Sequence, residues 1–176
     1  MRSLRVLALA LLALGAAGCG PRGPQPIAYG QDQCGYCRMT ISDERFGSEL
    51  VTRRGRVHKF DSVECLANYY LAQHGSEPAH SLWVTDYARP GEFVSADSAH
   101  FVQGERVSSP MGMGLLAVST PAEAERLARE HAGRRLSWEQ VLETVARAGA
   151  RVGAGHAAHG PAAPPPGGAG AHDTAH

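Results

Sequence analysis

The side chains with the clearest chemistry are sulfur groups in two short stretches of the sequence. The first stretch is Cys34-Gly35-Tyr36-Cys37-Arg38-Met39, and the second is Pro110-Met111-Gly112-Met113-Gly114. Thiolate and thioether sulfur are the donors that Cu(I) prefers, whereas harder ions select oxygen and nitrogen. We therefore predict that the fold brings the two stretches together around a soft ion, and that this ion is Cu(I).

Each stretch places two sulfur side chains two residues apart, Cys37 and Met39 in the first and Met111 and Met113 in the second. In an extended chain, residues i and i+2 point to the same side, so each pair can present both sulfurs to one ion. Methionine is more often a core residue than a ligand. Met111 belongs to no helical or strand pattern, and its flanking glycines let a loop bend closely over a site.

The N-terminus has the pattern of a bacterial lipoprotein signal. A basic start is followed by the apolar run 6–14 and by small residues up to Cys19, which predicts a signal peptide over residues 1–18. A cysteine at this point resembles a lipobox, although Ala16 stands where leucine is usual. We expect Cys19 to be lipidated and to anchor the protein in the cell envelope, facing the periplasm, with ordinary cleavage as the alternative. Gly20 is compatible with the outer membrane.

After lipidation of Cys19 an odd number of cysteines remains, namely Cys34, Cys37 and Cys65. In an oxidising compartment at least one thiol is then free, metal-bound or intermolecular. The Cys34-x-x-Cys37 pair has three alternatives to a copper clamp: a redox dithiol, part of a zinc site and a plain disulfide. Thioredoxin-like enzymes place such a pair at the start of a long helix, and the broken, β-branched residues 39–43 do not predict one.

The histidines are weaker ligand candidates. His58 and His100 fall in expected strands and are better placed than His74, His80 or His131. The C-terminal segment carries four more, His156, His159, His172 and His176, which could capture Cu(II), Zn(II) or Ni(II) weakly. Cys65 lies opposite the apolar face of its expected helix, so it is exposed there or covered by another part of the chain. A structural role is favoured for it, with a third sulfur ligand as the alternative.

Alternating patterns predict the elements that must position these residues. A hairpin over 48–60 precedes a helix capped by Asp61 and Glu64 and ended by His74-Gly75. Strands follow over 82–87, 93–96, 100–103 and 115–119. A helix then begins at Thr120 and stops at Gly133, and a last helix begins at Ser137.

This order predicts an α+β fold with small antiparallel or mixed sheets and packed helices. It also allows two similar ββα half-units, although no sequence repeat relates them. Residues 19–26 are expected to be a lipidated tether, 27–148 the metal-binding domain, and 149–176 a disordered tail rich in His, Pro, Gly and Ala. Lys and Arg number 17, as do Asp and Glu, so there is no electrostatic case for binding nucleic acid.

Several motifs in this order resemble the NosL family, the copper-binding lipoproteins that accompany nitrous-oxide reductase. They are Cys19, Cys34-x-x-Cys37-x-Met39, Phe60-Asp61 with Cys65, Trp83-Val84-Thr85-Asp86-Tyr87, Ala99-x-Phe101-Val102 and Pro110-Met111-Gly112. The resemblance spans residues 30–145. It departs from the family pattern at Arg38, where glycine is common, at the second methionine Met113, and in the His-rich tail.

The resemblance implies a periplasm-facing Cu(I) chaperone, not an enzyme, that delivers or holds copper for the copper centres of nitrous-oxide reductase. Its partners would be that client, the assembly proteins and the membrane. The soft ligands would be a cysteine of the Cys34/Cys37 pair and Met111, with a histidine or a partner residue completing the site. The implied fold is similar to a small α+β domain of organomercury lyases. A thiol–disulfide oxidoreductase that uses Cys34 and Cys37 is the alternative function.

Overall fold

The computed structural model describes residues 23–73 and 78–158, with side chains described up to residue 150. The expected signal peptide and Cys19 lie outside these residues, as does the segment 159–176. Within the described part of the chain, no helix combines the length and the apolar character needed to cross a membrane.

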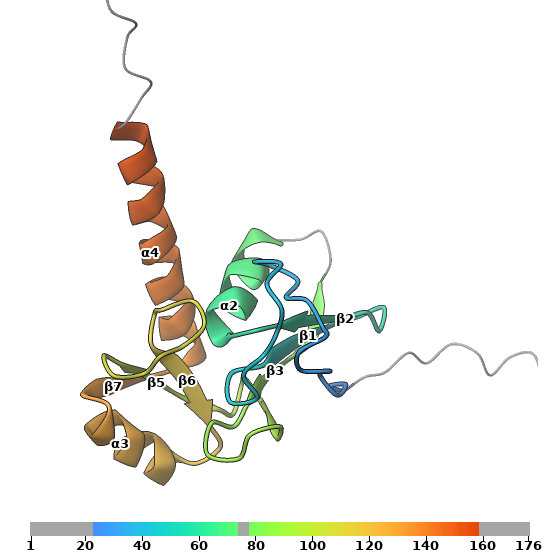
Figure 1. Ribbon diagram of the computed structural model, residues 1–176, viewed down its shortest axis with the longest axis horizontal. Helices are drawn as coiled ribbons and strands as arrows, with labels where there is room; N and C mark the ends of the chain where they lie inside the picture. Colours follow the sequence, from blue (N-terminus) through green and yellow to red (C-terminus); the bar gives the residue numbers. More distant parts are fainter. Residues whose placement is uncertain (1–22, 74–77, 159–176) are drawn as a thin grey trace, which may run out of the picture.

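Two units with the same ββαβ topology make up the fold (Figure 1). The first consists of β1 (Ser48–Thr52), β2 (Val57–Phe60), α2 (Val63–Ala72) and β3 (Ala79–Thr85). The second consists of β5 (His100–Gly104), β6 (Leu115–Val118), α3 (Pro121–Glu130) and β7 (Gly133–Leu136). The expected α+β class with similar half-units is therefore confirmed, and each half-unit ends in a third strand.

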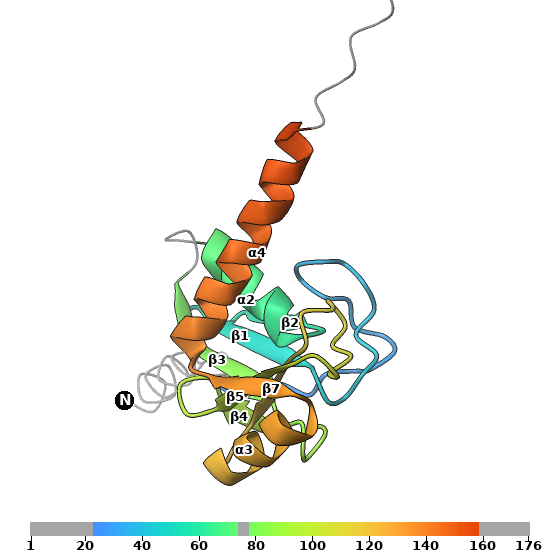
Figure 2. The ribbon, with the colours of Figure 1, turned by 90° about the vertical axis from the view of Figure 1, so that its left-hand side faces the viewer.

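Both sheets are antiparallel and follow the same plan. In each unit the first strand lies in the middle, giving the orders β2-β1-β3 and β6-β5-β7. The first sheet gains a fourth, edge strand from β4 (Phe93–Ser95), which pairs with β3. The last helix, α4 (Trp138–Ala158), packs on α2 and on the second sheet and then projects away from the domain (Figure 2).

The core has two parts that meet at the second sheet. Leu115 and Ala117 of β6 belong to the larger core, which also contains α2 and the base of α4, whereas Leu116 and Val118 belong to the smaller core under α3. Successive strand residues point to opposite faces, so β6 is buried on both sides. This explains its continuous apolar sequence.

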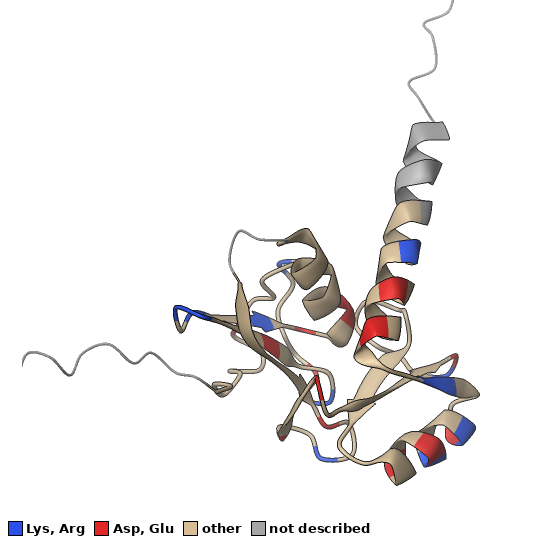
Figure 3. Cartoon of the chain, turned by 180° about the vertical axis from the view of Figure 1, so that it is seen from behind, with Lys and Arg blue, Asp and Glu red and all other residues tan. Residues whose placement is uncertain are grey.

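Helix α3 covers the outer face of the second sheet and shows why amphipathic spacing is informative. Ala124, Leu127 and Ala128 are buried against the sheet. The opposite face carries charges of both signs (Figure 3), including the pairs Arg126–Glu130 and Arg129–Glu125, each at 2.7 Å. Such exposed pairs add little stability, so burial of the apolar face is what holds α3 in place.

The N-terminal segment is tied to the first sheet by Lys59, the only lysine of the sequence. Its Nζ donates to the carbonyl of Pro26 and to Asp32 Oδ2, both at 2.7 Å. Asp32 also accepts from the backbone N–H of Ala28. The end of the expected tether is therefore bound to the domain, and the loop that carries the cysteines starts from a fixed position.

Four details differ from the sequence-based expectations. Ser62, not Asp61, is the N-cap of α2. Strand β3 begins at Ala79, and β7 was missed because Gly133 was interpreted only as a helix stop. Helix α4 continues past the expected boundary at 148, to Ala158. No proline lies between Pro121 and Pro161, so the backbone can continue the helix to this point.

Glu49 provides a test of the packing of the first sheet. Its side chain is fully buried in β1, one oxygen accepts from the backbone N–H of Gln25 at 2.8 Å, and the other has no partner among the described residues. Burial raises the pKa of Glu49 to about 7, from 4.5. The folded state therefore holds this proton over a pH range in which the unfolded chain has lost it.

We expect the free energy of unfolding to fall as pH rises from about 4.5 to 7, and Glu49→Gln to remove this part of the slope. Between pH 5 and pH 8, the free energy of unfolding should fall by on the order of 2 kcal/mol more in the wild type than in the variant. Urea denaturation at several pH values measures the effect. Parallel pH profiles for the two proteins would contradict it.

Candidate metal centre

Three thiols and one carboxylate meet at the start of α2. The donor atoms of Cys34, Cys37, Asp61 and Cys65 all lie within 4.8 Å of one another. Cys34, Asp61 and Cys65 are buried and Cys37 is half-buried, and all three cysteines are free thiols. The structure thus joins the two predicted cysteine ligands with two residues that the sequence analysis did not select.

The cysteine loop precedes β1 and is closed by backbone hydrogen bonds. An isolated bridge pairs Gln33 with Thr40, and the N–H of Cys34 donates to the carbonyl of Met39 at 2.8 Å. The N–H of Gly35 donates to Lys59 of β2, also at 2.8 Å. A Cβ on Gly35 would lie 3.3 Å from the ring of Phe60, so glycine lets the loop pack tightly on the strand.

The residue between each pair of sulfur side chains has a positive φ, 67° at Arg38 and 73° at Gly112. Neither Cys37 and Met39 nor Met111 and Met113 therefore lies in an extended chain, and the expected same-side arrangement does not apply. A left-handed conformation favours glycine. Arg38 adopts this conformation although it is not glycine.

Asp61 and Cys65 come from the junction of β2 and α2. Because Ser62 caps the helix through the N–H of Cys65, at 3.3 Å, Asp61 stands just before the cap and Cys65 in the first turn. The sequence left open whether Cys65 is exposed or covered by another part of the chain. It is covered, with 0% of its surface accessible. The first turn of α2 is buried on all sides, so the angle around the helix did not indicate exposure.

The surroundings within the cluster shift the pKa values of the three thiols in different directions. The Cys65 thiol hydrogen-bonds Cys34 and lowers the pKa of Cys34 to about 6, with further help from the backbone N–H groups of Asp61 and Cys37. The same hydrogen bond raises the pKa of Cys65. Burial raises the pKa of Cys37 to about 11, and its thiol donates to Asp61 Oδ2 at 3.4 Å. The hydrogen bonds and burial within the cluster therefore favour the thiolate form at Cys34 over Cys37 and Cys65.

The second sulfur stretch is held against α2 by Glu64. The loop between β5 and β6 lies beside the helix (Figures 1 and 2). Glu64 Oε1 accepts from the hydroxyl of Ser109 and from the N–H of Leu115 at 3.4 Å, and Ser109 accepts from the N–H of Gly114 at 3.0 Å. Glu64 was expected to complete a capping box, but it faces this loop instead. Both ends of the methionine loop are thus fixed to the helix that carries Cys65.

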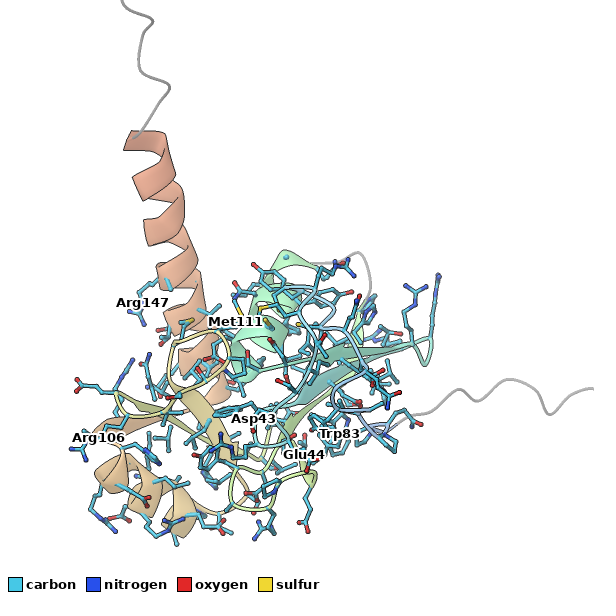
Figure 4. The ribbon with its side chains drawn as sticks, in the orientation of Figure 1. Asp43, Glu44, Trp83, Arg106, Met111 and Arg147 are labelled. Carbon is cyan, nitrogen blue, oxygen red and sulfur yellow. The ribbon has the colours of Figure 1, made fainter. Side chains whose placement is uncertain are left out.

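The methionines differ in their surroundings. Met39 is 57% exposed, and Met111 is 37% exposed on the loop beside α2 (Figure 4). Met113 is half-buried, packs on the core and lines a depression with Gln103 and Arg134. The assignment of all three as ligands stays a prediction, and Met111 and Met39 are the ones that solvent can reach.

The two favoured histidines lie elsewhere. The ring of His58 packs on Tyr69, with centroids 4.9 Å apart, and His100 lines a depression with Trp138. Among the described residues, the cluster of candidate metal ligands contains no histidine. Its donors are therefore sulfur and one carboxylate oxygen.

The geometry suits an ion that accepts sulfur ligands. Metal–sulfur bonds of about 2.3 Å place thiolates about 3.8 Å apart in a tetrahedron and about 4.0 Å apart in a trigonal plane. Donor atoms within 4.8 Å need to approach by less than about 1 Å to reach either arrangement. Three thiols satisfy the preference of Cu(I), and the added carboxylate also permits a tetrahedral divalent ion.

Asp61 and Cys65 were missed as site residues, although the sequence contained a signal for them. The capping pattern placed both residues at the start of the expected helix. The odd number of mature cysteines already required a role for one more thiol. What the sequence did not indicate is that the cysteine loop folds onto this turn.

Comparisons with known proteins agree on one family. A family model described as NosL matches residues 26–146. The copper-binding lipoprotein NosL of Stutzerimonas stutzeri is 30% identical over 149 residues, covering 77% of this chain and 78% of the relative. The crystal structure of the copper chaperone NosL from Shewanella denitrificans superposes with a TM-score of 0.61 at 23% identity, covering 68% of this chain and 96% of that one. The last likeness confirms the fold.

Glu64 is expected to control the position of the methionine loop. Glu64→Ala should cost about 3 kcal/mol of stability, because it leaves the buried donors of Ser109 and Leu115 without an acceptor. Glu64→Gln keeps an oxygen acceptor and should cost less than about 1 kcal/mol. Urea denaturation measures both costs, and hydrogen exchange of residues 105–114 should accelerate in the alanine variant alone. Equal behaviour of the two variants would contradict this role.

Proposed function

The chain belongs to the NosL family, and from that premise we propose that it is a Cu(I) chaperone of the cell envelope, without catalytic turnover. The observation that carries the proposal is the group of three thiols beside a loop that presents an exposed methionine. Thiol and thioether sulfur are ligands that a soft ion such as Cu(I) prefers. The names of the relatives, a copper-binding lipoprotein and a copper chaperone, support the same ion.

A chaperone must bind its ion firmly and still release it by ligand exchange. We assign Cys37 and Met111 as the principal ligands, with Met39 beside Cys37, Cys34 behind it, and Met113 as an auxiliary sulfur. Cys37 is only half-buried, and Met39 and Met111 are exposed. An incoming ligand from a partner protein can therefore reach the ion at this edge, which is the property that transfer requires.

A thiol–disulfide oxidoreductase is the second candidate, and the lowered pKa of Cys34 is the observation that favours it. Two features count against it. Cys34 has no accessible surface, so a protein disulfide cannot approach the thiolate. The Cys34-x-x-Cys37 pair lies in a turn before β1 and not at the start of a helix, where reactive pairs gain from the helix dipole.

The client and the membrane attachment are further parts of the proposal. We place the protein on the periplasmic side of the envelope, anchored through a lipid on Cys19, with the copper centres of nitrous-oxide reductase as the destination of the ion. The lipobox-like sequence before Cys19 and the lipoprotein name of the relative support the anchor. Transfer of copper to the metal-free reductase, followed by the appearance of its activity, tests the client.

We expect the reduced full-length protein to hold one Cu(I) against a chromogenic chelator. Cys37→Ser and Met111→Leu should each raise the dissociation constant at least tenfold, because each removes one of few ligands, and His100→Gln is the control outside the site. Competition titrations under anaerobic conditions measure the constants. Unchanged affinity in both sulfur variants would show that the site is misplaced.

Cys19 is expected to carry the anchor. Cys19→Ala should abolish incorporation of radiolabelled palmitate, because the variant lacks the thiol that would carry the acyl chain. Cys65→Ala serves as a cysteine control and should remain labelled. Unchanged labelling of the Cys19 variant would mean that the lipid, if present, is attached elsewhere.

A further inference from the structure

We propose that Cys34, Cys37, Cys65 and Asp61 form a second, inner position for the copper ion, behind an outer position at Met39 and Met111, and that Cys37 serves both. The inference rests on the proposed copper-binding function. It assigns a ligand role to Cys65, for which the sequence favoured a structural role over that of a third sulfur ligand. It assigns a second ligand role to Asp61, which the sequence indicated only as a helix cap. It also gives the protein two states, one closed around its ion and one open to a partner.

The first observation is a gradient of burial along the sulfur atoms. Cys34 and Cys65 have 0% of their surface accessible, Cys37 is half-buried, and Met111 and Met39 are exposed. An ion held by Cys34, Cys37 and Cys65 is therefore shielded from solvent and from competing ligands. An ion held by Cys37 and a methionine is not. Among the three cysteines of the cluster, Cys37 alone has the intermediate exposure that a shared ligand needs.

The second observation is the state of Asp61, which is 3% exposed. Its Oδ2 accepts from the Cys37 thiol at 3.4 Å, while Oδ1 is buried without a hydrogen-bond partner among the described residues. A buried carboxylate oxygen without a partner is costly, and a cation or a bound proton offsets that cost. Asp61 is thus a fourth donor that faces the thiols, and with them it completes a tetrahedral set.

The third observation concerns how the inner position is built. Cys65 and Asp61 belong to the start of α2, and Cys34 lies in a loop closed by the Gln33–Thr40 bridge. Cys65 therefore lies in a helix, Asp61 just before its cap, and Cys34 in a loop held by backbone hydrogen bonds. A site on rigid elements holds its ligands near the geometry of the bound state and loses little entropy on binding. This suits a position that retains the ion.

Movement between the two positions is a ligand exchange without redox change. The ion remains Cu(I), its bonds to Cys34, Cys65 and Asp61 break, and bonds to Met111 and Met39 form while the bond to Cys37 persists. The two thiolates released in the exchange each take a proton from solvent. Each thiolate is replaced by a thioether, so the ion is never left with oxygen and nitrogen ligands alone.

The test uses Co(II) as a probe of the inner position in reduced full-length protein. Wild-type protein should show an intense thiolate-to-cobalt band in the near ultraviolet and visible bands of a tetrahedral centre. Cys65→Ser should reduce the near-ultraviolet band by about one third, because one of three thiolates is lost. Asp61→Asn should keep that band and shift the visible bands. Met111→Leu should leave the whole spectrum unchanged, because its thioether belongs to the outer position.

Competition for Cu(I) separates this inference from the proposed function. If the wild type does not hold Cu(I) against the chelator, the proposed function fails. If it does, and Cys34→Ser and Cys65→Ser bind Cu(I) as tightly as the wild type, the inner position is absent. We expect both variants to bind at least tenfold more weakly while retaining native far-ultraviolet circular dichroism. A cobalt band that depends on Met111 would also overturn the inference.

Discussion

A single buried carboxylate, that of Glu64, joins the two halves of the site. It accepts hydrogen bonds from Ser109 and Leu115 at the two ends of the methionine loop, and it lies next to Cys65 in the first turn of α2. Burial raises the pKa of Glu64, so the cost of the buried group is lower when it carries a proton. This link fixes the loop that carries Met111 to the helix that carries Cys65.

The two ββαβ units carry different chemistry at the same position of a common topology. In the second unit, Thr120 caps α3 and the residue three positions later, Glu123, completes a capping box with it. In the first unit, Ser62 caps α2 and the corresponding residue is Cys65. The same position thus stabilises a helix in one unit and supplies a thiol in the other. The connection between the first two strands, short in the first unit, is the methionine loop in the second.

Much of this organisation could be predicted from the sequence. The hairpin at 48–60, the helix after Thr120 and the apolar strand β6 have strong local patterns, and all were confirmed. Strand β7 was missed because its residues 133–136, Gly-Arg-Arg-Leu, lack an apolar pattern. It exists because β5 offers a free edge for pairing, which is a tertiary cause.

The site was predictable in its sulfur content but not in its arrangement. Cys34 and Cys37 were identified from their spacing, whereas Cys65 and Asp61 join them only because the loop 30–41 packs against the end of β2 through Gly35 and Lys59. Contacts between segments this far apart leave no periodic trace in the sequence. The positive φ of Arg38 and Gly112 likewise overrode the simple rule for residues two apart.

In the proposed site, sulfur atoms hold the ion. X-ray absorption at the copper edge, on reduced full-length protein loaded with one equivalent of Cu(I), tests this most directly. We predict a first shell of two or three sulfur atoms with no histidine contribution, since the thiol cluster contains no histidine among the described residues. A first shell dominated by imidazole nitrogen would contradict the account and move the site to the histidines.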